Sequence, residues 1–158
     1  NWAEVVTRSD ELLKADTKNP HATRVRFQGA LARYRLAQYE QAAKVFEQLV
    51  APAAKTPLAH QVAFLLAECR RQLGNLDGAA EQYNAAVADK EGPFAAEARF
   101  RLGFVRFTQG QHDAAIKEFT AYLAAHPKGE LADRAGLHLG QSYLEKKDFA
   151  KAEASLKP

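Results

Sequence analysis

The sequence LGFVRFTQGQHDAAIKEFTAYLAAHP, residues 102–127, contains a pattern that recurs along the whole chain. The pattern combines a small residue, a short turn with glycine, and an alanine that a large ring follows four residues later. Its alanine stands at Ala42, Ala79, Ala115 and Ala152. These positions are 37, 36 and 37 residues apart, a period in the range of helical repeat proteins.

Each repeat contains two stretches in which apolar residues recur at spacings of three and four, as in amphipathic helices. Gly74 and Gly110 mark the turn inside a repeat, where glycine suits a left-handed helix end, and proline marks the boundary between repeats. Gly103 and Ala115 are small residues at fixed places, which predicts that two helices cross closely there. The predicted fold class is all-α, a right-handed superhelical solenoid of antiparallel helix pairs. Its nine predicted helices are 2–15, 20–36, 39–51, 57–73, 76–89, 93–109, 112–125, 129–146 and 149–157.

We predict a single repeat domain over residues 1–158. It begins with a half repeat at 1–19, because Trp2 falls at the place that Tyr39 holds one period later. The half repeat and the absence of methionine favour a fragment of a longer protein. The full repeats are expected at 20–56, 57–92, 93–128 and 129–158.

The pattern resembles the tetratricopeptide repeat, whose signature is W-x2-L-G-x2-Y, then A-x3-F, then P. The repeat at 93–128 matches it through Leu102, Gly103, Ala115, Phe119 and Pro127. The tryptophan position departs from the signature and holds Arg26, Ala63, Arg99 and Gly136. The resemblance implies a scaffold that binds other proteins and that catalyses nothing itself.

The repeats exceed the family's usual length of about 34 residues. The extra residues fall between units, where we expect them to lengthen each first helix. The segment His126-Pro127-Lys128-Gly129, with Ala132, Ala135 and Leu139-Gly140 after it, resembles a bacterial envelope variant of the repeat. That variant occurs in the periplasmic coordinator of the Tol–Pal system and in the lipoprotein subunit of the outer-membrane β-barrel assembly machine. It implies a bacterial protein, in the periplasm or at the outer membrane rather than in the cytoplasm.

No residue pattern points to a catalytic site, a cofactor, a metal ion or a small-molecule substrate. The five histidines are scattered without metal-ligand spacing, and neither a nucleophile turn nor a glycine-rich phosphate loop is present. Cys69 is the single cysteine and lies in an apolar helical stretch, which predicts a small buried residue. The net charge is only +3 and no apolar run approaches about 20 residues, so we expect neither nucleic-acid binding nor membrane insertion.

The resemblance places the partner-binding groove on the first helix of each repeat, at its second, fifth, ninth, twelfth and thirteenth positions. Many of these positions hold large aromatic residues or arginine, which are typical of interface hot spots. An alternative remains open for each ring, namely that it points into the core between repeats. The predicted partner-binding residues are Arg24, Phe27, Leu31, Tyr34, Arg35, Phe64, Arg71, Phe100, Phe104 and Phe107.

The two basic residue types are segregated. Of the 11 arginines only Arg8 lies outside the predicted first helices, whereas the 11 lysines lie in second helices, turns or loops, with Lys146 at the end of its helix. One interpretation is a concave face for an acidic or carboxylate-ended peptide, because arginine binds carboxylates through two parallel hydrogen bonds. The other is that the arginines at a shared motif position form structural ion pairs between repeats. The residues at that position are Arg33, Arg70 and Arg106.

The sequence thus predicts a protein-interaction scaffold that binds a polypeptide segment in a concave groove, in the setting of bacterial envelope assembly. Two other classes of function are weighed against it. The chain could be the regulatory or targeting arm of a larger enzyme. Single-stranded nucleic-acid binding would also use arginines beside rings, but the small net charge speaks against it.

Overall fold

The computed structural model describes residues 1–15, 21–90 and 92–156. Within these residues the chain forms nine α-helices and no strand, so the all-α prediction is confirmed. The helices are α1 (Trp2–Ala15), α2 (Ala22–Arg35), α3 (Tyr39–Ala53), α4 (Ala59–Gln72), α5 (Leu76–Val87), α6 (Ala95–Thr108), α7 (His112–Ala125), α8 (Ala132–Glu145) and α9 (Phe149–Leu156).

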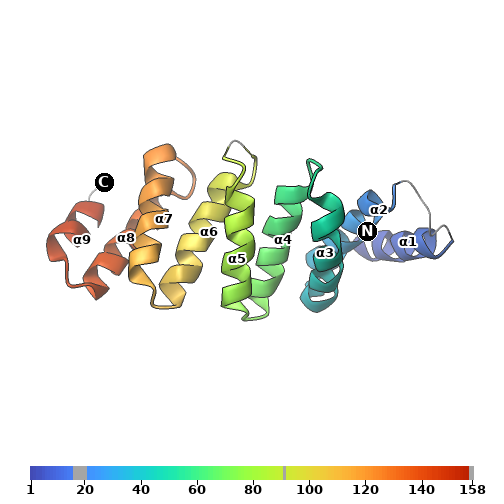
Figure 1. The fold of residues 1–158 in the computed structure, drawn as a ribbon. Helices are drawn as coiled ribbons and strands as arrows, with labels where there is room; N and C mark the ends of the chain where they lie inside the picture. The colour runs from blue at the N-terminus through green and yellow to red at the C-terminus, as the bar shows by residue number, and fades with distance from the viewer. Residues whose placement is uncertain (16–20, 91, 157–158) are drawn as a thin grey trace. The chain divides into compact units, whose positions relative to one another are not determined.

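The chain divides into two compact units, Asn1–Ala86 and Val87–Pro158. In the first unit α1 packs against α2, α2 against α3, and α4 against both α3 and α2. In the second unit α7 packs against both α6 and α8, and α8 packs against α6 and α9. Consecutive helices within each unit run antiparallel, as Figure 1 shows. Within each unit, α2 or α6 therefore contacts its own second helix and the next first helix, and that second helix also packs against the next first helix.

The turn inside each repeat has the geometry of a Schellman helix end. In the repeat of α4 and α5, Gly74 has a φ of 78° and the backbone N–H of Asn75 donates to the carbonyl of Arg70 at 2.9 Å. The same bond at the same distance recurs from Gln111 to Arg106, beside Gly110. The predicted left-handed helix ends at the two glycines are therefore confirmed. Positive φ angles are found at Ala37, Gly74, Gly110 and Lys147.

Between repeats the chain makes two successive turns. After α3 the N–H of Thr56 donates to the carbonyl of Ala53 at 2.8 Å, and the N–H of Ala59 donates to that of Thr56 at 3.1 Å. Pro57 takes the second place of the second turn, where its fixed φ is favourable. The same pair of bonds precedes α6 and α8, from Gly92 to Asp89, Ala95 to Gly92, Gly129 to His126 and Ala132 to Gly129.

The prediction that the extra residues lengthen each first helix is therefore wrong. Helices α4 and α6 begin two residues later than predicted, because proline serves the turn and does not start the helix. Helix α8 begins three residues later, because Gly129 is the first residue of the turn that ends at Ala132. The predicted boundary at residues 19–20 lies outside the described residues, as does the predicted end of the last helix at residue 157.

The alanine and the ring of the repeat pattern form the core of each helix pair. Ala115 and Phe119 are fully buried, as are their counterparts in the two preceding repeats. A Cβ atom added to Gly103 would lie 2.8 Å from Cε1 of Phe119. Helices α6 and α7 thus cross so closely that glycine is needed, as the small residues of the signature predict. The counterparts of this alanine and ring are Ala42, Phe46, Ala79 and Tyr83.

Candidate functional site

Three rings of the predicted binding set lie in the core. Phe27, Phe64 and Phe100 are 3%, 7% and 0% exposed. Each packs against the ring of its own second helix, with centroid separations of 6.0, 6.0 and 5.8 Å. The predicted contact of these three rings with a partner is therefore corrected, and the alternative of rings in the core holds for them. The second-helix rings that they contact are Phe46, Tyr83 and Phe119.

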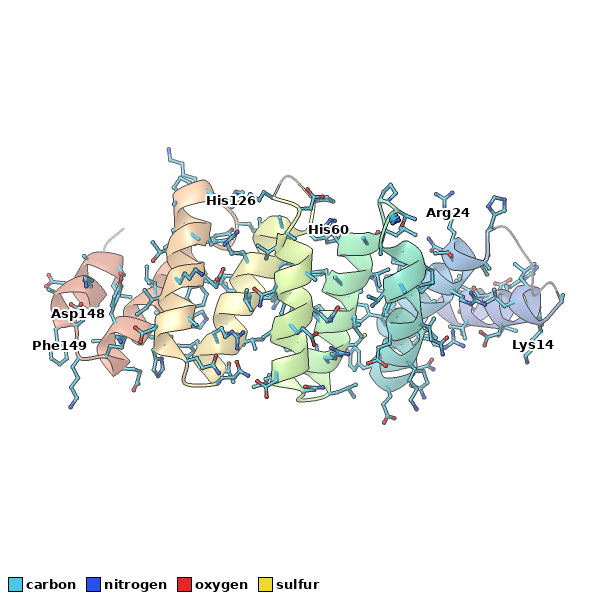
Figure 2. The ribbon with its side chains drawn as sticks, viewed as in Figure 1. Lys14, Arg24, His60, His126, Asp148 and Phe149 are labelled. Carbon is cyan, nitrogen blue, oxygen red and sulfur yellow. The ribbon has the colours of Figure 1, made fainter. Side chains whose placement is uncertain are left out.

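The exposed residues of the predicted set in the first unit lie on α2. Arg24 and Arg35 are exposed near the two ends of this helix, and Figure 2 shows Arg24 extending away from it. Leu31 and Tyr34 are half-buried between them. The ring of Tyr34 packs edge-on against Tyr39 at 5.7 Å. Burial, followed by the charge of Glu68, raises the pKa of the Tyr34 phenol, which therefore stays protonated and can donate a hydrogen bond.

A buried carboxylate holds Arg71, the remaining predicted residue of this unit. Glu68 is 4% exposed, accepts a hydrogen bond from the Tyr83 hydroxyl, and pairs with Nη2 of Arg71 at 3.0 Å. These two partners offset the cost of burying the carboxylate. Burial is also the main reason that the pKa of Tyr83 is raised, with the negative charge of Glu68 as the next cause. Glu68 falls on the ninth groove position of its repeat but is not among the predicted partner-binding residues. An acid three residues before an arginine on one helix could have indicated the pair.

Cys69 follows Glu68 and is fully buried, as its apolar surroundings in the sequence predict. Burial raises the pKa of its thiol to about 12. The thiolate is the reactive form of cysteine, so this side chain fills space in the core and is chemically inert at neutral pH.

Two half-buried rings on α6 and one imidazole on α8 form an aromatic cluster in the second unit. Phe104 and Phe107 lie 5.2 and 5.4 Å from the ring of His138, measured between centroids. Nδ1 of His138 lies 2.9 Å from Oε1 of Gln141 and donates to it, which fixes the imidazole on this side of α8. His138 was not predicted as a site residue, because it does not fall on one of the five groove positions.

Helix α8 also carries two exposed leucines. Leu137 and Leu144 are 47% and 45% exposed, and they lie three or four residues on either side of Gln141 on one face of the helix. We call the three rings of Phe104, Phe107 and His138 the aromatic surface. Its rings are half-buried and keep accessible area, so it is suited to an apolar anchor of a partner.

The arginines at the shared motif position form structural contacts. Arg33 pairs with Asp10 at 2.7 Å, and Arg70 pairs with Glu47 at 3.1 Å. Both pairs join a first helix to the second helix of the preceding repeat, so the interpretation as ion pairs between repeats holds for these two. Arg106 instead donates hydrogen bonds to the side-chain amide oxygens of Gln109 and Gln111.

The described part of the chain contains no group of three or more His, Cys, Asp or Glu side chains that could hold a metal ion. Nor does any of its helices combine the length and the apolar character needed to cross a bilayer.

A model of the tetratricopeptide repeat-like domain matches residues 13–136, more than half of the chain. The chain belongs to this family. A solved structure of MamA is similar over 96% of this chain and 82% of that chain, with a TM-score of 0.80 and 18% identity. No curated protein matches the sequence.

Two further tetratricopeptide-like structures are similar. A putative kinesin light chain from Podosopora anserina with nearly identical TPR-like repeats matches with a TM-score of 0.76 and 19% identity, over 98% of this chain and 83% of that chain. BtubC from P. vanneervenii matches with a TM-score of 0.74 and 22% identity, over 98% of this chain and 67% of its own. At these identities the likeness shows the fold, and the tetratricopeptide-like solenoid is confirmed.

Proposed function

We propose that this protein is an interaction scaffold whose first helices bind a segment of another polypeptide. The observation that carries the proposal is the aromatic surface, where Phe104 and Phe107 remain half-buried although the other first-helix phenylalanines are in the core. Rings that keep accessible area on a rigid helix contribute contact area at a low cost in conformational entropy. The expected anchor of the partner is therefore an apolar side chain seated on this surface.

The distribution of charge supports acidic flanks on that partner. Helix α2 carries four arginines and no acid, and Arg24 and Arg35 are its exposed ones. Helix α8 contains Asp133 and Glu145 against Arg134. Apolar anchoring is expected to supply most of the affinity, whereas exposed arginines set orientation and the rate of association.

The setting in the bacterial envelope is part of the proposal. It is supported by the segment His126-Pro127-Lys128-Gly129, which forms the first of the two turns before α8, with the Gly129 N–H bonded to the His126 carbonyl at 3.1 Å. Fractionation of the source cells, with immunodetection of the untagged protein, tests this setting. Recovery in the cytoplasmic fraction alone would refute it.

A matched pair of substitutions tests the binding surface. After a partner has been captured with the chain and identified by mass spectrometry, its affinity is measured by calorimetry for Phe104→Ala and Lys117→Ala. Lys117 is exposed on the second helix α7. We expect Phe104→Ala to weaken binding by more than about 1 kcal/mol, as truncated anchors do, and Lys117→Ala to leave it unchanged.

Because Phe104 also packs against His138, the melting temperature of each variant is recorded as a control. Leu144→Ala, at an exposed position of the first helix α8, provides a second reading with little effect on the core. If Lys117→Ala weakens binding while Phe104→Ala and Leu144→Ala do not, the partner uses the second helices and the proposed surface is wrong.

A further inference from the structure

One position of the repeat alternates between large and small side chains. It is the tryptophan position of the family signature, which holds Arg26, Ala63, Arg99 and Gly136 in the four repeats. In the third repeat Arg99 on α6 reaches α7, its own second helix, and pairs with Glu118 at 3.1 Å. The side chains of this pair are only 25% and 13% exposed. A long side chain at this position therefore fills space between a first helix and its own second helix.

A hollow lies at this position in the other three repeats. The hollow at Arg26 measures about 120 Å³, the one at Ala63 about 210 Å³, and the one at Gly136 about 540 Å³. The three hollows share equivalent walls, because Leu13, Val50 and Leu123 line one side and Val45, Gln82 and Ser155 line another. The volume thus grows as the residue shrinks from arginine to alanine to glycine.

The hollow at Ala63 has an uncharged lining. Gln82 stands where the third repeat has Glu118, so a cation that entered would find no carboxylate there. The ring of His60, on the α4 side (Figure 2), donates from Nδ1 to the carbonyl of Ala85 on α5 at 3.1 Å and fixes one wall. The lining residues are Val50, Ala54, Ala59, His60, Ala63, Gln82 and Ala85.

We propose that the hollow at Ala63 is a second docking site, which takes an aromatic side chain presented by a partner protein. The hollow is open to solvent on one side and has a volume of about 210 Å³. An enclosed aliphatic cavity of about 150 Å³ is enough to bind benzene, so the hollow is large enough for a ring. The uncharged lining favours a neutral ring over the arginine that stands at this position in the first and third repeats. The side-chain oxygen of Gln82 or the second ring nitrogen of His60 can accept a hydrogen bond from the N–H of an indole, which is the polar group of tryptophan. This site uses α3, α4 and α5 and does not depend on the aromatic surface of the second unit.

Indole is a direct probe of the site. The protein is labelled with ¹³C in its alanine methyl groups and titrated with indole while methyl spectra are recorded by NMR. We expect the signals of Ala59, Ala63 and Ala85 to shift together and to fit a single Kd in the millimolar range. Filling the hollow by Ala63→Arg, with the residue that the neighbouring repeats use, should weaken binding at least tenfold.

Matched variants make each outcome decisive. Ala124→Arg makes the same change at an exposed position of α7 and should leave the titration unchanged. Ala85→Leu covers the rim from an exposed site and replaces Ala63→Arg if that variant does not fold. Phe104→Ala, which tests the aromatic surface, should also leave the signals of Ala59, Ala63 and Ala85 unaffected.

Three results would overturn the proposal. The first is no shift of these methyl signals up to the solubility of indole. The second is an unchanged shift of the remaining methyl signals in both Ala63→Arg and Ala85→Leu. The third is equal affinity for N-acetyl-leucinamide, which would show that any apolar group fits and that the aromatic preference is wrong.

Discussion

At the scale of single residues, the turn inside the repeat imposes one backbone conformation on two glycines, an alanine and a lysine. Gly74 and Gly110 have φ angles of 78° and 71°, and Ala37 and Lys147 adopt 57° and 61° at the same place. The left-handed conformation costs a residue with a side chain about 1–2 kcal/mol, because Cβ crowds the following carbonyl oxygen. A Cβ added to Gly74 would meet nothing within 4 Å. Backbone conformation alone therefore decides which residue is best at this turn.

We predict opposite effects for two reciprocal substitutions. Ala37→Gly should raise the free energy of unfolding by up to about 1 kcal/mol, since the relief of strain exceeds the entropy that glycine loses on folding. Gly74→Ala should lower it by about the same amount. Urea denaturation followed by circular dichroism measures both changes. A loss of stability in both variants would show that strain at Ala37 is not what limits this turn.

At the scale of helices, one crossing recurs with different packing solutions. Gly103 faces the Phe119 ring, and a Cβ added to Gly140 would lie 2.8 Å from Cγ of Leu156. In the first and second repeats the same place holds a fully buried alanine. The crossing thus admits a methyl group in the first unit, whereas in the second unit the Phe119 ring and the Leu156 side chain occupy that space.

Overpacking this crossing provides a test of the repeat alignment. Gly103→Leu should lower the free energy of unfolding by about 1–3 kcal/mol, because the Phe119 ring must move or α6 and α7 must separate. Thr108→Leu is the control, since it adds a leucine at an exposed position of the same helix and should change stability by less than about 0.5 kcal/mol. Thermal or urea denaturation of both proteins gives the comparison. Equal stability of Gly103→Leu and the parent protein would contradict the alignment.

The same scale explains what the sequence could and could not predict. Helix existence and pairing follow from the period and from the small residues, which only a close crossing requires. The beginnings of the first helices were placed too early, because proline suits both a first helical position and the second place of a turn. The rings at the fifth groove position were predicted to contact a partner for a different reason. A ring there can turn toward the partner or toward its own second helix, and only the position of the helix pair decides, as Phe27 shows.

The candidate site was predictable to a similar degree. Arg24, Arg35, Phe104 and Phe107 do keep exposed or half-buried surface. The clustering of His138 with the two rings depends on how α8 packs against α6, which no spacing within one helix contains. The sequence showed the hollow at Ala63 only as a departure from the signature, because a hollow is defined by the packing of several helices and not by one residue.

At the scale of the whole molecule, stability should follow the number of neighbours that each helix has. In repeat proteins each element is stabilised chiefly by the elements next to it. Helix α1 packs mainly against α2, and α9 packs mainly against α8. These two helices also carry large exposed apolar side chains, including Leu12 at 51% and Phe149 at 66% exposure. Helix α4 contrasts with both, since every residue from Val62 to Cys69 is buried.

Hydrogen exchange of the 158-residue chain should therefore be slowest in α4 and fastest in α1 and α9. Opening α4 exposes an uninterrupted run of core residues and breaks its packing with α2 and α3, so it requires an event close to global unfolding. Opening α9 separates it from α8 alone and uncovers little besides Ala152, its one buried residue. Amide exchange read by NMR or mass spectrometry, with Phe149→Ala as a variant that should leave the rates in α4 unchanged, measures this order. If α9 were as protected as α4, its amides would open only together with the rest of its unit, and local opening from the ends would be refuted.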